Sequence, residues 1–216
     1  MHPLYDEFLE YIDKEDKEKC VEFVLNKLDN KEINVPTLYK EILEPSLNRF
    51  YCDVDEEKLC IWKEHVRSSI IRTIIELCYP YILKERNERN IKILNKKIFI
   101  GCPAEEYHEI GARMIADIFI LNGYDAIFVG ANTPREEIRD AINSLKPAYI
   151  GICITNYFTL IEAEKAISLI KEHTEFTGKI LVGGQAFLSN PDNYKKIGAD
   201  LLIQNYGDIE KLAKEG

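Results

Sequence analysis

The spacing of apolar residues changes near residue 96, and this change divides the chain into two parts. In the first part, apolar residues recur at the three- and four-residue spacing of amphipathic helices. These stripes predict four helices, which we expect over residues 4–12, 21–29, 34–47 and 59–79. Because short loops join these helices, residues 1–95 are predicted to form a four-helix bundle.

Prolines and polar residues modify this prediction. Pro36 stands at the start of the third helix, where its missing N–H costs nothing. Pro45 is predicted to kink that helix and Pro80 to interrupt the fourth. The polar stretch 85–90 is predicted to end the bundle and lead into a linker. One face of the fourth helix is expected to consist of Leu59, Trp62, Val66, Ile70, Ile74 and Leu77.

After residue 96, short apolar runs alternate with amphipathic segments. The predicted strands are Lys97–Gly101, Ala126–Val129, Tyr149–Ile154, Lys179–Val182 and Asp200–Ile203. The predicted helices are His108–Asn122, Arg135–Leu145, Leu160–Thr174, Asp192–Ile197 and Asp208–Lys214. Because the strands are continuously apolar, both faces of their sheet should be covered. The pattern favours an α/β domain over residues 96–216, with a flavodoxin-like, doubly wound, five-stranded parallel sheet.

Unusual residues gather at one predicted edge of this sheet. With strand order 2-1-3-4-5, the order reverses between strands one and three, and ligands bind beyond the carboxyl ends there. The loop from Glu106 to His108 follows strand one, the run Cys153-Ile154-Thr155-Asn156 closes strand three, and Gly183-Gly184 closes strand four. The sequence therefore predicts a ligand site at this edge.

His108 is the candidate metal ligand at this edge. Glu106 stands two residues before it, and metal-bound histidines usually donate their other ring N–H to a carboxylate or carbonyl. Gly111 would let the helix start approach a neighbouring strand or a bulky ligand closely. The alternative is that Glu105, Glu106 and Glu109 are simply acids favoured in a first helical turn. That alternative leaves the histidine unexplained.

Two further features have an ordinary interpretation beside a functional one. Gly183-Gly184 can be a plain strand-to-loop turn, or can leave a slot for a long group beside the sheet. Glu64-His65 can be an exposed pair on an amphipathic helix with Trp62 in the bundle core. Alternatively, the pair could touch the other face of a ligand bound by the second domain.

Composition narrows the class of protein. The 216 residues carry a net charge of −9, and neither half has the basic surplus of a nucleic-acid binder. The six cysteines form no C-x-x-C pair, which argues against structural zinc and a disulfide scaffold. With no membrane-length apolar run and no signal pattern, we expect a cytoplasmic protein that does not bind membranes. Dinucleotide-binding and P-loop motifs do not occur.

The second part resembles the B12-binding (cobalamin-binding) domain over its full length. The resemblance rests on Glu106-x-His108-x-x-Gly111, the loop 129–134 with Thr133-Pro134, the end of strand three, and Gly183-Gly184, in order and spacing. The first part resembles the four-helix cap that precedes such domains in corrinoid proteins. The corrinoid carriers of methyltransferases usually have aspartate at the position of Glu106, and the photoreceptor and regulator branch resembles this chain in Glu106, the Thr133-Pro134 loop and Glu64-His65.

The resemblance implies a base-off cobalamin whose cobalt is bound from below by His108, with Glu106 on the far imidazole nitrogen. It implies that the nucleotide tail threads past Cys153, Thr155, Gly183 and Gly184, while the helical cap covers the upper ligand.

The chain departs from the family pattern at two places. The family's Ser-x-Leu at the end of strand three is here Cys153-Ile154-Thr155, and a thiol is a weak hydrogen-bond partner. Thr155 or Asn156 could substitute for that serine. Val54 occupies the position at which the photoreceptor branch has a tryptophan over an adenosyl group, and Tyr51 and Trp62 lie near enough in the sequence to provide a lid.

Three functions are compatible with these observations. The first is a corrinoid carrier that shuttles a methyl group between partner methyltransferases and needs no catalytic residues of its own, because cobalt carries the chemistry. The second is a stand-alone cobalamin or light sensor that acts through a partner protein. The third is a flavodoxin-like domain that binds another small molecule, with His108 an ordinary surface residue.

Overall fold

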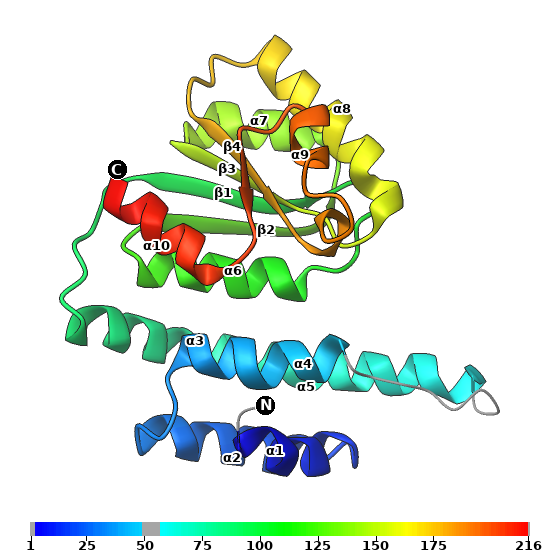
Figure 1. The fold of residues 1–216 in the computed structure, drawn as a ribbon, viewed down its shortest axis with the longest axis vertical. Coiled ribbons are helices and arrows are strands. Elements are labelled where there is room, and N and C mark those ends of the chain that lie inside the picture. Colours follow the sequence, from blue (N-terminus) through cyan, green and yellow to red (C-terminus); the bar gives the residue numbers. More distant parts are fainter. Residues whose placement is uncertain (1–2, 49–56, 216) are drawn as a thin grey trace. The chain divides into compact units, whose positions relative to one another are not determined.

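A computed structural model describes residues 3–48 and 57–215 of the chain (Figure 1). The chain divides into two compact units, Met1–Glu85 and Arg86–Gly216. The first is helical and the second has an α/β fold, as the apolar pattern predicts.

The helical unit contains the four predicted helical segments. Their bounds are α1 Leu4–Ile12, α2 Lys17–Asp29, a third run made of α3 Val35–Leu38, η1 Tyr39–Leu43 and α4 Glu44–Asn48, and α5 Glu57–Glu88. Asp16 caps α2 by accepting a hydrogen bond from the Lys19 N–H at 3.1 Å. Asn34 caps α3 in the same way, with Pro36 in its first turn.

The prolines of this unit have different effects. Directly before Pro45 the chain forms the π-helical turn η1, in which the Glu44 N–H donates to the Tyr39 carbonyl. A π turn there provides the local distortion expected beside a proline. The predicted interruption at Pro80 is wrong, because α5 continues through it to Glu88. Cys78 and Ile82 on either side are fully buried, and this burial offsets the missing backbone hydrogen bond.

The buried face of α5 differs from the predicted stripe. Trp62 and Leu77 are 47% and 40% exposed, so neither belongs to the core. The core positions of α5 are instead Arg67, Ile70, Ile71, Ile74, Ile75, Cys78 and Ile82. The ordinary interpretation that placed Trp62 in the bundle core is therefore wrong.

Arg67 joins three helices of this unit. Its guanidinium is buried, forms an ion pair with Asp13 at the end of α1, and donates from Nη1 to the Ser46 carbonyl in α4 at 3.1 Å. Ser46 is also buried and donates from Oγ to the Ile42 carbonyl at 2.7 Å. A buried carbonyl that lost its donor would keep its desolvation cost, so Arg67 stabilises this part of the bundle.

The α/β unit has the predicted sheet. Its five strands are all parallel in the order β2-β1-β3-β4-β5. Their bounds are β1 Lys97–Pro103, β2 Asp125–Thr133, β3 Tyr149–Cys153, β4 Lys179–Gly183 and β5 Leu201–Ile203. The helices are α6 Ile110–Leu121, α7 Arg135–Leu145, α8 Leu160–His173, α9 Asn193–Lys196 and α10 Tyr206–Glu215, with short turns η3 Tyr157–Thr159 and η4 Gln185–Phe187.

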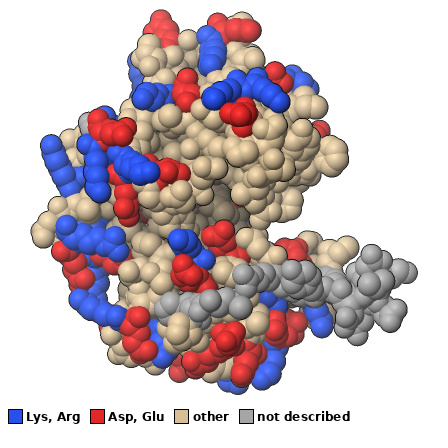
Figure 2. Space-filling view, in the orientation of Figure 1, with Lys and Arg blue, Asp and Glu red and all other residues tan. Residues whose placement is uncertain are grey.

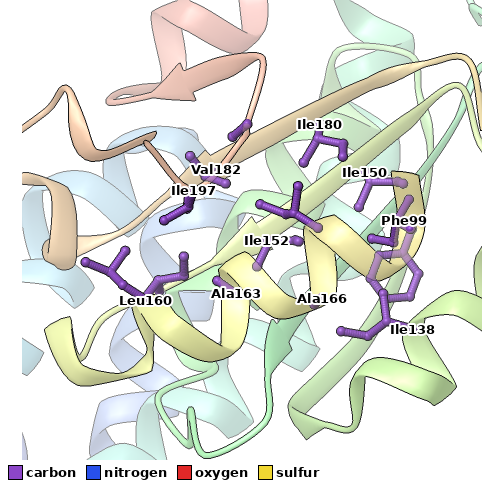
Figure 3. Packing of buried hydrophobic residues seen from close by; sticks show 14 of the residues in the cluster. Phe99, Ile138, Ile150, Ile152, Leu160, Ala163, Ala166, Ile180, Val182 and Ile197 are labelled. Carbon is purple, nitrogen blue, oxygen red and sulfur yellow. The ribbon is translucent and has the colours of Figure 1, made fainter. Parts of the chain in front are cut away.

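Helices cover both faces of the sheet. In Figure 1, α6 and α10 lie on one face, and α7 and α8 on the other. Strand side chains such as Phe99, Ile150 and Ile180 pack against α7 and α8 in a continuous apolar core (Figure 3). The residues of α8 in this core include Leu160, Ala163 and Ala166. This double coverage is the reason that the strands read as unbroken apolar runs.

Several element boundaries at the carboxyl edge differ from prediction, most of all the end of β2 and the start of α6. Strand β2 continues four residues beyond the predicted end to Thr133, with irregular pairing between Gly101 and Pro103 of β1. Helix α6 begins at Ile110, so His108 lies in the loop before it. Strand β2 is therefore longer than predicted, and the loop between β1 and α6 extends to Glu109.

The segment after α5 is attached to the α/β unit. The Leu94 N–H donates to the Gly123 carbonyl at 2.8 Å. Gly123 has φ +90°, and a Cβ there would overlap the Lys92 carbonyl, so only glycine permits this packing.

Within the described residues, no helix combines the length and apolarity that crossing a bilayer requires.

Replacing Arg67 with alanine is expected to lower the free energy of unfolding of the helical unit by about 1–3 kcal/mol, because the Ser46 carbonyl loses its buried donor. Urea titration followed by circular dichroism measures this change. Arg72→Ala is the matched control, since Arg72 is exposed on the same helix, and should change stability by less than about 0.5 kcal/mol. Equal effects of the two substitutions would contradict the assigned role of Arg67.

Candidate functional site

A fully buried carboxylate, that of Glu106, lies at the carboxyl end of β1. The turn that carries it closes on the strand, because the Glu106 N–H donates to the Pro103 carbonyl at 3.1 Å. A carboxylate without solvent needs hydrogen-bond donors from the protein. The surrounding loops supply them.

Both oxygens of Glu106 accept several hydrogen bonds. Oε1 accepts from the backbone N–H of His108 at 3.0 Å and lies 2.6 Å from its Nδ1. Oε2 accepts from the backbone N–H groups of Thr155 and Asn156 at 2.9 and 2.7 Å. The Thr159 hydroxyl lies 3.1 Å from Oε2 and 2.7 Å from the Asn156 carbonyl oxygen, so its single proton is shared between these two acceptors. The carboxylate therefore connects the loop after β1 to the loop after β3.

These donors keep Glu106 ionised. Burial alone would raise its pKa, but hydrogen bonds from the Asn156 and His108 N–H groups, the His108 ring and the Thr155 N–H outweigh it, and the net pKa is lowered. An ionised carboxylate only accepts, so Nδ1 of His108 donates to Oε1. In the neutral imidazole the lone pair is then on Nε2.

The His108 side chain is 65% exposed, whereas its Glu106 partner is completely buried. The imidazole is thus held at Nδ1 from inside the protein and presents Nε2 outward. This is the arrangement in which a histidine binds a metal with one nitrogen and is oriented through the other.

The alternative interpretation of the glutamates as first-turn acids is wrong for Glu106 and Glu109. Helix α6 has no acidic residue in its first turn, and Glu106 lies before it. Glu109 is at the helix start but accepts a hydrogen bond from the Ala131 N–H of β2 at 2.8 Å. Both side chains therefore bind neighbouring backbone.

Gly111 does not pack closely against a strand. A Cβ at this position would meet no atom within 4 Å, and the residue is exposed at the start of α6. The close approach to a neighbouring strand is thus not its role. Open space beside the helix start is consistent with the other expectation, room for a bulky ligand.

The predicted residues after β3 mainly use their backbone. Thr155 and Asn156 donate N–H groups to Glu106, and the Asn156 side chain accepts from the Phe158 N–H at 3.1 Å. Cys153 is partly buried, and burial, together with the nearby Glu106 charge, raises the pKa of its thiol to about 12. The thiol is therefore protonated and neutral at physiological pH.

The paired glycines after β4 satisfy a backbone requirement. Gly184 has φ +111°, and a Cβ there would overlap the Ile154 carbonyl. A Cβ on Gly183 would lie 2.9 Å from the Ile203 carbonyl oxygen of β5. These contacts support the plain strand-to-loop interpretation, since the ends of β3, β4 and β5 could not otherwise come so close.

Thr133, at the end of β2, is buried and donates from Oγ1 to the Gly130 carbonyl at 3.4 Å. Its side chain therefore contacts the backbone of its own strand end. Pro103 of β1 pairs with Thr133 in the sheet, which brings the end of β2 beside the Glu106 turn.

The predicted residues of the helical unit form a separate exposed group on α5. His65 Nε2 lies 3.5 Å from a Glu64 oxygen, and the other Glu64 oxygen accepts from the Ser68 hydroxyl at 2.7 Å. Trp62 is exposed on the same helix. This is the exposed-pair arrangement that the sequence offered as one possibility. Tyr51 and Val54 lie outside the described residues.

Sequence reasoning missed three polar residues and an apolar set at this edge. Thr159 precedes the predicted helix at Leu160, a position where a threonine commonly caps, yet its hydroxyl binds Glu106. Asn132 and Glu109 bind backbone across two loops, which no local pattern reveals.

Exposed apolar side chains in or just after β1–β4 are Tyr107, Val129, Tyr157, Phe158 and Leu188. In Figure 2, few charged groups lie on the right-hand side of the α/β unit, where the strands end in Figure 1.

Replacing Glu106 with glutamine is expected to lower the free energy of unfolding at neutral pH by about 2–4 kcal/mol, because an amide cannot accept all the donors around it. The pKa of Glu106 lies below its ordinary 4.5, so its ionised form contributes stability above that pH and loses it as pH falls through the folded value. The stability difference should therefore stay constant well above pH 4.5 and shrink as the pH is lowered below 4.5. Denaturant titration at several pH values measures it, with Glu164→Gln as the exposed control.

A difference that stayed constant with pH, or that matched the control, would contradict the ionised, hydrogen-bonded state of Glu106.

Known proteins share both the sequence pattern of the α/β unit and the fold of the chain. Residues 96–212 match the family model of the B12 binding domain. Curated protein sequences include no significant match. The fold resembles the monomethylamine corrinoid protein of Methanosarcina barkeri, with TM-score 0.77 and 15% identity over 98% of this chain and 97% of that one.

Two other solved structures share the fold. A cobalamin-binding protein of Desulfitobacterium hafniense DCB-2 has TM-score 0.51 and 16% identity over 98% of this chain and 97% of that one. The methanol:cobalamin methyltransferase complex of Methanosarcina barkeri has TM-score 0.52 and 17% identity over 96% of this chain and 77% of that one. The family match covers more than half of the chain and includes the Glu106–His108 turn. The chain therefore belongs to the B12-binding domain family, and its cofactor is cobalamin.

Proposed function

We propose that this protein binds cobalamin in the base-off form, with His108 Nε2 as the lower ligand of cobalt, and that it is a corrinoid carrier for partner methyltransferases. The observation that carries the proposal is the 2.6 Å contact between His108 Nδ1 and the buried Glu106 carboxylate, which leaves the lone pair on Nε2 of an exposed side chain.

The residues at this edge suit such a cofactor. The open space beside Gly111 and the exposed Tyr107 and Val129 offer room and apolar contact for a large, partly apolar group. Glu106 would hold the imidazole in the tautomer that donates from Nδ1, and would raise the basicity of Nε2.

Cobalamin, when bound, supplies the methyl-carrying cobalt, and this chain's residues bind and orient it. A carrier role is supported by the likeness over nearly the full length of both chains to a corrinoid protein. The methanol:cobalamin methyltransferase complex, which shares the fold, supports a methyltransferase as partner. We expect direct binding neither to nucleic acid nor to membranes.

The second candidate is a cobalamin or light sensor that regulates through a partner protein. The exposed Glu64–His65 pair and the exposed Trp62 on α5 favour it, because the regulator branch resembles this chain in that pair and these side chains lie outside the helical core. The identity of that upper ligand separates the two functions. A methyl group indicates a carrier and an adenosyl group a sensor.

Replacing His108 with alanine is expected to remove the nitrogen hyperfine splitting of the Co(II) EPR spectrum when the protein is loaded with a corrinoid that lacks its own base. The unchanged protein should show the splitting, because Nε2 then supplies the only axial nitrogen. His173→Ala is the matched control, since His173 is another exposed histidine beside a glutamate, Glu172, in the same unit. Splitting that survives in the His108 variant would exclude His108 as the lower ligand.

The carrier proposal predicts that protein loaded with adenosylcobalamin keeps the same oligomeric state in darkness and after illumination. It also predicts that the cobalamin-loaded protein, reduced to Co(I) by an added chemical reductant, takes up one methyl group from methyl iodide with release of iodide and keeps that methyl group through gel filtration. Sedimentation velocity before and after light, together with visible spectra, measures both. A light-dependent change in mass would favour the sensor instead.

A further inference from the structure

The end of β2 is interlocked with the turn that carries Glu106 and His108. The Glu105 N–H donates to Asn132 Oδ1 at 2.9 Å, and the Asn132 N–H donates to the Glu106 carbonyl at 2.8 Å. One residue earlier, the Ala131 N–H donates to Glu109 Oε2 at 2.8 Å. The contacts run in both directions, so the two segments hold one another.

The backbone of both segments is unusual at these contacts. Glu105 has φ +66° and Asn132 has φ +48°, and the two are directly hydrogen-bonded. A non-glycine residue in the left-handed region is unfavourable, less so for asparagine, and persists where the surroundings hold it. The Asn132 side chain is such a restraint, because it accepts from the strained residue itself.

Gly130 makes room for the contact between the Ala131 N–H and Glu109 Oε2. Gly130 has φ +111°, and a Cβ there would lie 3.2 Å from Glu109 Oε2. The Glu109 carboxylate therefore sits against the backbone of β2 where only glycine leaves it full space. Glu109 is the residue directly after His108, so its contact anchors the chain on the far side of the imidazole.

We propose that Asn132 and Glu109 are positioning residues for His108. Glu106 fixes the imidazole through its carboxylate from the β3 side, whereas Asn132 and Glu109 fix the backbone that carries both residues from the β2 side. The Nδ1–H tautomer requires Glu106 Oε1 to stay within hydrogen-bond distance of the ring, and that distance depends on the turn between residues 105 and 109. The consequence for cobalt binding rests on the proposed function.

Asn132→Gly is the most selective test. Glycine adopts the left-handed backbone and keeps the N–H that donates to Glu106, so only the side-chain acceptor for Glu105 is lost. Asn132→Asp keeps an acceptor and should restore the behaviour of the unchanged protein. Glu109→Ala removes the second anchor independently, and Asn143→Ala on the exposed face of α7 is the control.

The first readout uses the cofactor-free protein. Imidazole ¹⁵N chemical shifts at about pH 8.5, above the ordinary histidine range, report which nitrogen carries the proton. The unchanged protein, the Asp variant and the control should show His108 protonated at Nδ1. The Gly and Glu109 variants should show a mixture of both tautomers. Uniform Nδ1 protonation in both of these folded variants, or Nε2 protonation in the unchanged protein, would overturn the proposal.

The second readout is the dissociation constant for a corrinoid that lacks its own base, which should rise about tenfold in the Gly and Glu109 variants. If the unchanged protein does not bind the corrinoid through His108, the proposed function fails while the tautomer comparison still decides the positioning role. If the unchanged protein binds through His108 and both variants bind equally tightly, the positioning role fails alone.

Discussion

The hydrogen-bonded burial of the Glu106 carboxylate is the interaction on which this site depends. An ionised group without solvent is strongly unfavourable unless the protein supplies donors, and here they come from His108, Thr155, Asn156 and Thr159. Because these donors belong to loops after two different strands, the same carboxylate stabilises the fold and orients the imidazole. The site and the edge of the sheet are thus one structural unit.

The sheet topology explains why this carboxylate can reach so many donors. Strands β1 and β3 are adjacent only because the chain returns past β1 after β2, and their carboxyl ends leave the sheet together. The loop after β3 presents two consecutive N–H groups beside the loop after β1. The corrinoid and cobalamin-binding proteins that share this fold, at 15–17% identity, indicate that the topology persists although most side chains differ.

Much of the fold could be predicted from apolar spacing, because a helix buried along one stripe and a strand buried on both faces each have a characteristic pattern of apolar residues. The five strands were predicted from these patterns, their order from the flavodoxin-like alternation of strands and helices, and the Glu106–His108 pair from a local motif. The continuation of α5 through Pro80 and the exposure of Trp62 did not, since packing partners distant in sequence decide them. The contacts of Asn132, Glu109 and Thr159 were equally hidden, because each joins loops 22 to 53 residues apart.

Glu106 and His108 differ in burial and in role, so relatives that no longer bind cobalamin are expected to lose the two residues at different rates. Glu106 is buried and accepts three backbone hydrogen bonds that do not involve the imidazole, from the N–H groups of His108, Thr155 and Asn156. A descendant that had ceased to bind cobalt would still need an acceptor there to fold. The exposed His108 ring contributes less to the stability of the fold, so in such a descendant it could be replaced by other residues. Retention of the histidine, rather than of the acid, is therefore the informative mark of a chain that still uses its cofactor.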